Sequence, residues 1–145
     1  PGTTSDLVSG FEDWLPTIIE VADGKPLTQP IGDGVSILNA LTGKADAQKK
    51  KPFLYREFAG YGGHQAVWMG KWKGIRVGLQ KKLTPIELYD LEKDPSESNN
   101  LAESLPEVVA KIETIMKSEH VHNPTFPLRA IDAPHTIGKP KPKKK

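Results

Sequence analysis

Apolar and polar residues alternate along four short stretches in the middle of the chain. These stretches cover residues 53–58, 65–70, 72–77 and 86–91, and glycine-rich or polar turns separate them. Alternation with a period of two is typical of strands that bury one face, and short turns favour antiparallel neighbours. The pattern therefore predicts a four-stranded antiparallel meander.

Before the strands, apolar residues recur at helical spacing. Asp13 is placed to cap a helix that ends at Gly24, and Pro16 lies in the first turn, where its missing N–H costs little. The apolar face of this helix, which we expect to be buried, consists of Leu15, Ile18, Ile19 and Ala22. A face of this kind requires a docking partner.

After the strands, a second helix is expected. Ser104 has the position of an N-cap, Glu107 completes a capping box, and Pro106 lies in the first turn. Its apolar stripe consists of Val108, Val109, Ile112, Ile115 and Met116. Packed on the sheet, this helix gives an α+β fold class: a four-stranded antiparallel sheet against a C-terminal helix, preceded by a helical segment.

Charge and composition divide the chain into three parts. Residues 45–52, ADAQKKKP, are charged and poor in apolar groups, so they mark a boundary between residues 1–44 and 45–122. Residues 123–145 are expected to form an extended, disordered basic tail, because the last seven residues contain five lysines and few apolar groups.

The same distribution of charge limits the function. The formal net charge is +2, and it becomes −3 without the five terminal lysines, which argues against a basic face for nucleic acid. No run approaches the roughly 18 apolar residues that a membrane helix requires. The chain contains no cysteine, so disulfides, thiolate zinc sites and cysteine nucleophiles are excluded within it.

Four segments resemble a known family in its own order. The most specific is IELYDLEKDPSESNNLA, residues 86–102, in which a strand leads through an Asp-Pro turn, and an Asn pair suited to left-handed backbone, to a helix entrance. The others are PGTTSDLVSGFEDWLPTIIEVADG, residues 1–24, DGVSILNALTGK, residues 33–44, and FLYREFAGYGGHQAVWMGKWKGIRV, residues 53–77. Together they resemble the C-terminal portion of formylglycine-dependent sulfatases, the arylsulfatase family of the alkaline phosphatase-like superfamily.

The resemblance implies a parent enzyme that hydrolyses sulfate esters of a carbohydrate, with calcium and formylglycine as its catalytic groups. It implies that residues 1–44 end the N-terminal α/β domain and that residues 45–122 form the C-terminal subdomain, whose partner is the chain's own catalytic domain. A periplasmic or secreted location is expected from the family. The fragment would then shape the pocket for a sulfated small molecule or glycan.

The family's nucleophile is not expected within this chain. A formylglycine precursor is a Cys or Ser followed by Pro two places later and Arg four places later. Ser104 has the proline at Pro106, but Val108 stands where the motif needs Arg. Because the chain also begins at Pro1 without an initiator methionine, we expect a fragment or a processed chain that is inactive alone, with both catalytic groups upstream.

Two residues are candidates for substrate binding, and none is predicted to be catalytic. His64 ends the glycine-rich turn between two strands, and the resemblance places this rim at the substrate cleft, where an imidazole can bind a sulfate ester or a sugar hydroxyl. Glu57, on the preceding strand, can accept a hydrogen bond from a substrate hydroxyl. The alternatives are an ordinary turn histidine and a solvent-facing or arginine-paired glutamate.

The other histidines do not define a metal site. His120 and His122 flank Val121, and His135 lies in the tail, but the spacing fixes no third ligand. Two alternative functions remain open. One is a phosphoester or phosphonate hydrolase of the same superfamily, and the other is a non-catalytic carbohydrate-binding module.

Overall fold

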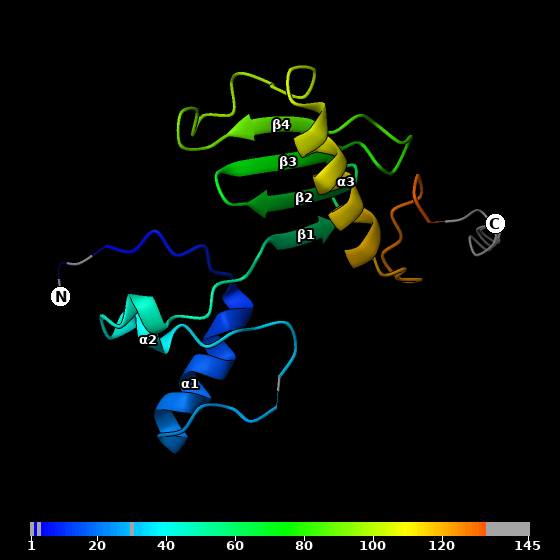
Figure 1. Ribbon diagram of the computed structural model, residues 1–145. Helices are drawn as coiled ribbons and strands as arrows, with labels where there is room; N and C mark the ends of the chain where they lie inside the picture. Colours follow the sequence, from blue (N-terminus) through cyan, green and yellow to red (C-terminus); the bar gives the residue numbers. More distant parts are fainter. Residues whose placement is uncertain (1, 3, 30, 133–145) are drawn as a thin grey trace, which may run out of the picture. The chain divides into compact units, whose positions relative to one another are not determined.

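A computed structural model of the protein describes residues 2, 4–29 and 31–132 (Figure 1). The chain forms two compact units, Pro1–Leu54 and Tyr55–Lys145. The boundary between them follows the charged connection of residues 45–52 rather than preceding it. Within the described ranges, no helix has the length and apolar character needed to cross a membrane.

Polar anchors organise the first unit. It contains a 3-10 turn, η1 (Phe11–Asp13), then the helix α1 (Trp14–Asp23), the short helix α2 (Leu38–Leu41) and a second 3-10 turn, η2 (Ala45–Ala47). The buried carboxylate of Asp13 accepts hydrogen bonds from the backbone N–H groups of Gly10 and Val35, both at 2.8 Å, and Lys51 lies 2.7 Å from it. Helix α1 is thereby tied to the segments before and after it.

Helix α1 begins and ends where the sequence predicts, but its predicted apolar face is not buried. Asp13 is its N-cap and Gly24 ends it with a left-handed φ of 66°. The side of the helix that packs within the unit carries Pro16 and Thr17, and the Thr17 hydroxyl accepts from the N–H of Ile37 at 2.9 Å. The predicted apolar face is mostly exposed to solvent. Leu15 and Ile18 expose 54% and 61% of their surface, Ala22 is exposed, and Ile19 is half-buried.

The sheet of the second unit confirms the predicted meander. Its strands are β1 (Leu54–Phe58), β2 (His64–Met69), β3 (Trp72–Val77) and β4 (Glu87–Asp90), arranged side by side in the order β1-β2-β3-β4 (Figure 1). Strands β2 and β3 are antiparallel with Val67 opposite Gly74, and β3 and β4 are antiparallel with Gly74 opposite Leu88. Val67 and Leu88 are fully buried, so the centre of the core lies on this register line.

Helix α3 (Pro106–Glu119) covers one face of the sheet, as the apolar stripe predicts (Figure 1). Ile112 and Met116 expose 0% and 1% of their surface. The predicted cap is wrong by one residue: Leu105, not Ser104, is the N-cap, and it makes no side-chain capping hydrogen bond. Proline disfavours helical backbone in the residue before it, so the helix begins at Pro106 itself.

The signature of residues 86–102 is held by side chains that replace strand hydrogen bonds. Asn100 accepts from the N–H of Leu88 on β4 at 3.0 Å, and Leu101 donates to the carbonyl of Leu88 at 2.8 Å. Asp94 accepts from two successive backbone N–H groups, each at 2.8 Å. The left-handed residue of this turn is Glu97, with a φ of 55°, and not the predicted asparagine pair.

Gly74 provides the close approach between the sheet and α3. A Cβ atom at this position would lie 2.6 Å from Cγ2 and 2.9 Å from Cδ1 of Ile112. Replacing Gly74 with Ala is expected to lower the free energy of unfolding by about 1–3 kcal/mol, because it overpacks this contact. Denaturant unfolding tests this, and the added Ile112→Ala change should cost less in the variant than in the wild type. Additive costs would contradict the contact as the cause.

Candidate functional site

The two predicted binding residues lie on either side of one turn. Glu57 is near the end of β1 and His64 begins β2. The His64 ring donates from Nε2 to the carbonyl of Tyr61 at 2.9 Å, and its Nδ1 has no hydrogen-bond partner among the residues that the structure describes. Tyr61 has a positive φ of 48°, which brings its carbonyl back toward the histidine. His64 is therefore oriented by its own turn.

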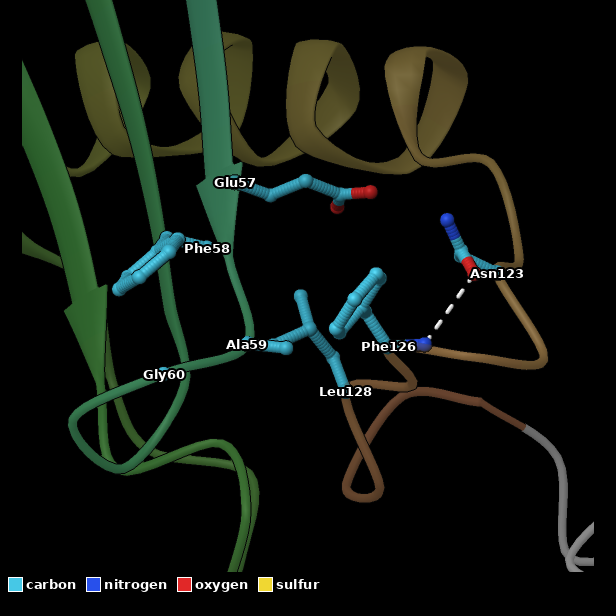
Figure 2. Close-up of a pocket in the computed structure, with 7 residues that line it drawn as sticks. All are labelled: Glu57, Phe58, Ala59, Gly60, Asn123, Phe126 and Leu128. Atoms are coloured by element: carbon cyan, nitrogen blue, oxygen red, sulfur yellow. Dashed lines mark hydrogen bonds between the residues drawn. The ribbon is translucent and has the colours of Figure 1, made fainter.

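Glu57 opens onto a cavity of about 300 Å³ between the end of β1 and the segment that follows α3 (Figure 2). The cavity is lined by Glu57, Phe58, Ala59, Gly60, Asn123, Phe126 and Leu128. His64 is not among the lining residues, so the structure does not bring the two predicted residues together in this space.

The Glu57 carboxylate is held in place by two donors on the same oxygen. The Tyr55 hydroxyl donates to Oε2 at 2.5 Å, and Nδ1 of His120 lies 2.9 Å from that oxygen. The side-chain amide of Gln65 in turn donates to the Tyr55 hydroxyl at 2.8 Å. Burial, together with the hydrogen bond to Glu57, raises the pKa of Tyr55 well above its usual value, so the phenol remains a donor.

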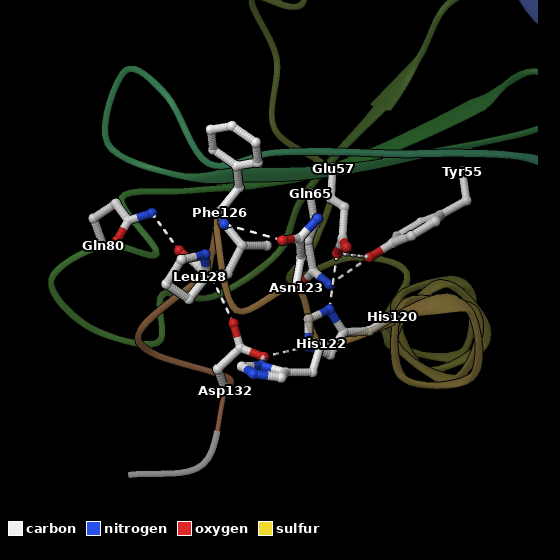
Figure 3. A network of polar contacts seen from close by, with 11 residues as sticks. Tyr55, Glu57, Gln65, Gln80, His120, His122, Asn123, Phe126, Leu128 and Asp132 are labelled. Atoms are coloured by element: carbon white, nitrogen blue, oxygen red, sulfur yellow. Dashed lines mark hydrogen bonds and ion pairs between the residues drawn. The ribbon is translucent and has the colours of Figure 1, made fainter. Parts of the chain in front are cut away.

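His120 lies between two carboxylates (Figure 3). Its Nδ1 faces Glu57 and its Nε2 faces Oδ1 of Asp132 at 3.1 Å, and His122 also contacts this oxygen, at 2.5 Å. Burial alone would lower the pKa of His120, but the hydrogen bonds and charges of Glu57 and Asp132 raise it above its ordinary 6.5. An imidazolium with a carboxylate at each nitrogen therefore ties the chain after α3 to strand β1.

Asp132 anchors the last described segment of the chain. It exposes 1% of its side chain, and its second oxygen accepts from the N–H of Leu128 at 2.6 Å. Burial would raise the pKa of this carboxyl, but the hydrogen bonds from His122, from the Leu128 N–H and from His120 hold it below 3.8. Leu128 is itself buried, and it contacts the turn before β2 at Gly63, where a Cβ atom would come within 3.0 Å of it.

These contacts correct the start of the predicted tail. The sequence places residues 123–132 in a disordered extension, but the structure buries Leu128 and Asp132 and ties Asp132 to His120 and His122. Gln80 adds two hydrogen bonds, to the carbonyls of Ala59 at 3.0 Å and Pro127 at 2.7 Å. The remainder of the predicted tail, residues 133–145 with His135, lies outside the described residues.

The described residues offer no metal centre: none of their His, Asp and Glu side chains gather in a group of three or more that would hold an ion. The pair that the sequence singles out, His120 and His122, converges on Asp132 instead.

Sequence reasoning missed most of this network because it joins distant parts of the chain. Glu57 and His120 are 63 residues apart in sequence. The segment HVHNPTFPLRAID does carry a local signal, since Asn123-Pro124 favours a turn. In the structure, Asn123 accepts from the N–H groups of Thr125 and Phe126 and forms that turn.

An antiparallel meander with one helix across it, and a cavity at its rim that the Glu57 carboxylate lines, defines a small α+β unit. No family model matches the sequence. The chain is, however, 28% identical over 130 residues to arylsulfatase K of Bos taurus, a match that covers 81% of this chain. It is 36% identical over 96 residues to choline-sulfatase of Rhizobium meliloti (strain 1021), which covers 63% of this chain.

Solved structures share the fold of this chain. A protein of Bacteroides thetaiotaomicron assigned as a sulfatase matches 73% of this chain with a TM-score of 0.60 and 24% identity. A second solved structure, a protein in complex with its substrate D-glucosamine-2-N,6-O-disulfate, matches 72% of this chain with a TM-score of 0.52 and 23% identity. The comparisons confirm the resemblance to sulfatases. The chain spans 24% of the length of arylsulfatase K and 17% of that of choline-sulfatase.

Proposed function

We propose that this chain is the C-terminal part of an enzyme that hydrolyses sulfate esters of a carbohydrate. The similarity to arylsulfatase K and choline-sulfatase carries the proposal. The sugar disulfate bound by one structural neighbour supports a carbohydrate substrate. In this proposal the chain helps to shape the substrate pocket and does not perform the chemistry.

The residues of this chain do not fit the two catalytic groups of the family. It has no cysteine, Ser104 lacks the arginine of the precursor motif, and the described acidic residues form no calcium site. Formylglycine supplies the nucleophile and calcium the charge stabilisation in such enzymes. The proposal therefore assigns both groups to other parts of the parent protein, which would be periplasmic or secreted.

The apolar surface of the first unit supports a partner within that parent. Exposed large apolar side chains gather on and around α1, namely Val8, Phe11, Trp14, Leu15, Ile18 and Val21. Soluble proteins rarely leave a contiguous patch of this kind uncovered. We infer that it docks on the catalytic domain of the same protein, which argues against a free-standing carbohydrate-binding module.

Activity and peptide mapping of the natural-length protein test the proposed function. Hydrolysis of a sugar sulfate, together with a Cys or Ser converted to formylglycine, would support it. Faster hydrolysis of the matched phosphate ester, with an unmodified Thr or Ser as nucleophile, would overturn it in favour of a phosphoester or phosphonate hydrolase. Glycan binding without hydrolysis of either ester would favour the binding module.

His64 is expected to contact the substrate in this enzyme. Replacing it with Ala should lower kcat/KM for a sugar sulfate by about 10- to 100-fold, the usual cost of losing one hydrogen bond to a charged group. The matched control is Tyr61→Ala, which keeps the backbone carbonyl that orients His64. An unchanged kcat/KM in the His64 variant would remove this residue from the substrate site.

A further inference from the structure

The cavity beside Glu57 combines an apolar wall with a polar edge. Phe126, Leu128 and Ala59 supply the wall, and Glu57 and Asn123 supply the edge (Figure 2). Phe126 exposes 67% of its surface, so aromatic surface is available to a ligand. Ligand sites typically pair such apolar surface with a few placed polar groups.

The two polar side chains each keep one hydrogen-bonding atom free. Both donors to Glu57 use Oε2, so Oε1 remains an open acceptor among the described contacts. Asn123 accepts through Oδ1 from the N–H groups of Thr125 at 2.9 Å and Phe126 at 3.1 Å, which fixes its amide orientation and leaves Nδ2 as an open donor. An acceptor and a donor thus face one space (Figure 2).

We propose that this cavity is a subsite for one pyranose ring of a glycan. The ring's C–H face would lie on Phe126, while adjacent hydroxyl groups would donate to Oε1 of Glu57 and accept from Nδ2 of Asn123. As a subsite of the substrate, it rests on the proposed sulfatase function. Its binding of a sugar can be measured separately.

The charge of Glu57 determines whether this subsite binds a sulfated or an unsulfated ring of a glycan. A sulfate group would meet the negative Glu57 carboxylate, and like charges at this range repel. A quaternary ammonium ion has no N–H group and no lone pair, so it can neither donate to Oε1 of Glu57 nor accept from Nδ2 of Asn123. Hydroxyl groups carry no charge and can use both free atoms. The subsite is therefore expected to hold an unsulfated ring.

The size of the cavity fits a single ring and a modest affinity. Its volume of about 300 Å³ lies at the lower end of the range for small-molecule sites. A ligand of about a dozen heavy atoms held by two hydrogen bonds and one aromatic contact is expected to bind with a Kd of the order of millimolar.

Ligand-observed and protein-observed NMR of the natural-length protein test the proposal. The probes are methyl β-galactopyranoside, methyl β-glucopyranoside and N-acetylglucosamine, with choline and inorganic sulfate as charged comparisons. At least one pyranoside is expected to bind saturably. Its binding should shift the NMR signals of Glu57, Asn123 and Phe126. Binding of choline or sulfate at these residues without any pyranoside would overturn the proposal, as would no binding at all.

Variants locate the binding. Phe126→Ala, a change at an exposed ring, should weaken the pyranoside at least 5-fold, and Glu57→Gln should weaken it as well. Tyr61→Ala is the matched control, because this tyrosine is 95% exposed on the same turn and does not line the cavity. Equal affinity in the Phe126 and Glu57 variants would overturn the subsite.

The same protein distinguishes the two proposals. A small aryl sulfate has no second ring that could occupy this cavity. Its hydrolysis therefore measures the sulfatase activity independently of the subsite. Hydrolysis without pyranoside binding would reject the subsite and keep the proposed function. Pyranoside binding without hydrolysis would keep a sugar site and reject the sulfatase.

Discussion

Replacing Ile18 with Asp is expected to lower the free energy of unfolding of the natural-length protein by about 2–4 kcal/mol. Ile18 lies in the middle of α1 and exposes 61% of its surface in this chain. If the apolar surface around α1 docks on the catalytic domain, the new carboxylate would enter an apolar interface without a partner. If the surface is free, the same change would place a charge in water at almost no cost.

The matched control is Lys25→Asp, which introduces the same side chain just beyond the end of α1 at an exposed position. Thermal unfolding of both variants and the wild type would compare the two sites directly. A much lower Tm for the Ile18 variant than for the Lys25 variant is the expected result. Equal Tm values would show that α1 has no partner in the protein, and would return the binding-module alternative to consideration.

The strands and helices were predictable because local patterns specify them. Alternation along the four strands and helical spacing along α3 each reflect burial on one side of the same element. Residues such as Val67, Leu88, Ile112 and Met116 are buried as those patterns require. Pattern alone thus identified the meander and the helix that covers it.

The face of α1 shows where pattern stops being sufficient. Helical spacing identified Leu15, Ile18, Ile19 and Ala22 as one apolar face, and these residues do lie on one side of α1. It could not state what covers that face, and the unit buries the opposite side through Thr17. Periodicity reports that a surface is apolar, but burial also requires a partner within reach.

The candidate site was only half predictable for a different reason. The sequence singled out Glu57 and His64 because they flank a recognisable turn, and only Glu57 lines the cavity. The contacts of His120, Asn123 and Asp132 depend on a chain reversal after α3 that brings residues far apart in sequence together. The lysine-rich composition of the tail also extended the predicted disorder over residues 123–132, because a buried Asp132 carries no signal in composition.

Asp132 should make the attachment of the segment after α3 depend on pH. Replacing Asp132 with Asn is expected to weaken this attachment by about 1–3 kcal/mol, because it removes the charged acceptor that His120, His122 and the Leu128 N–H share. Hydrogen exchange at the Leu128 N–H measures the loss. Asp46→Asn is the control, since Asp46 is exposed in the other unit.

The direction of the pH dependence follows from the two shifted groups. The pKa of His120 is raised above 6.5, so its stabilising contribution is complete below pH 6.5 and is lost as pH rises through the folded-state pKa. The pKa of Asp132 is lowered below 3.8, so its contribution is complete above pH 3.8 and is lost as pH falls through the folded-state pKa.

Protection of the Leu128 N–H from hydrogen exchange should therefore be greatest between pH 3.8 and pH 6.5, and it should decline as the pH rises through the folded-state pKa of His120. A histidine NMR titration should show that Asp132→Asn lowers the pKa of His120, whereas protection that rises steadily from pH 6 to pH 8 would contradict the charged pair.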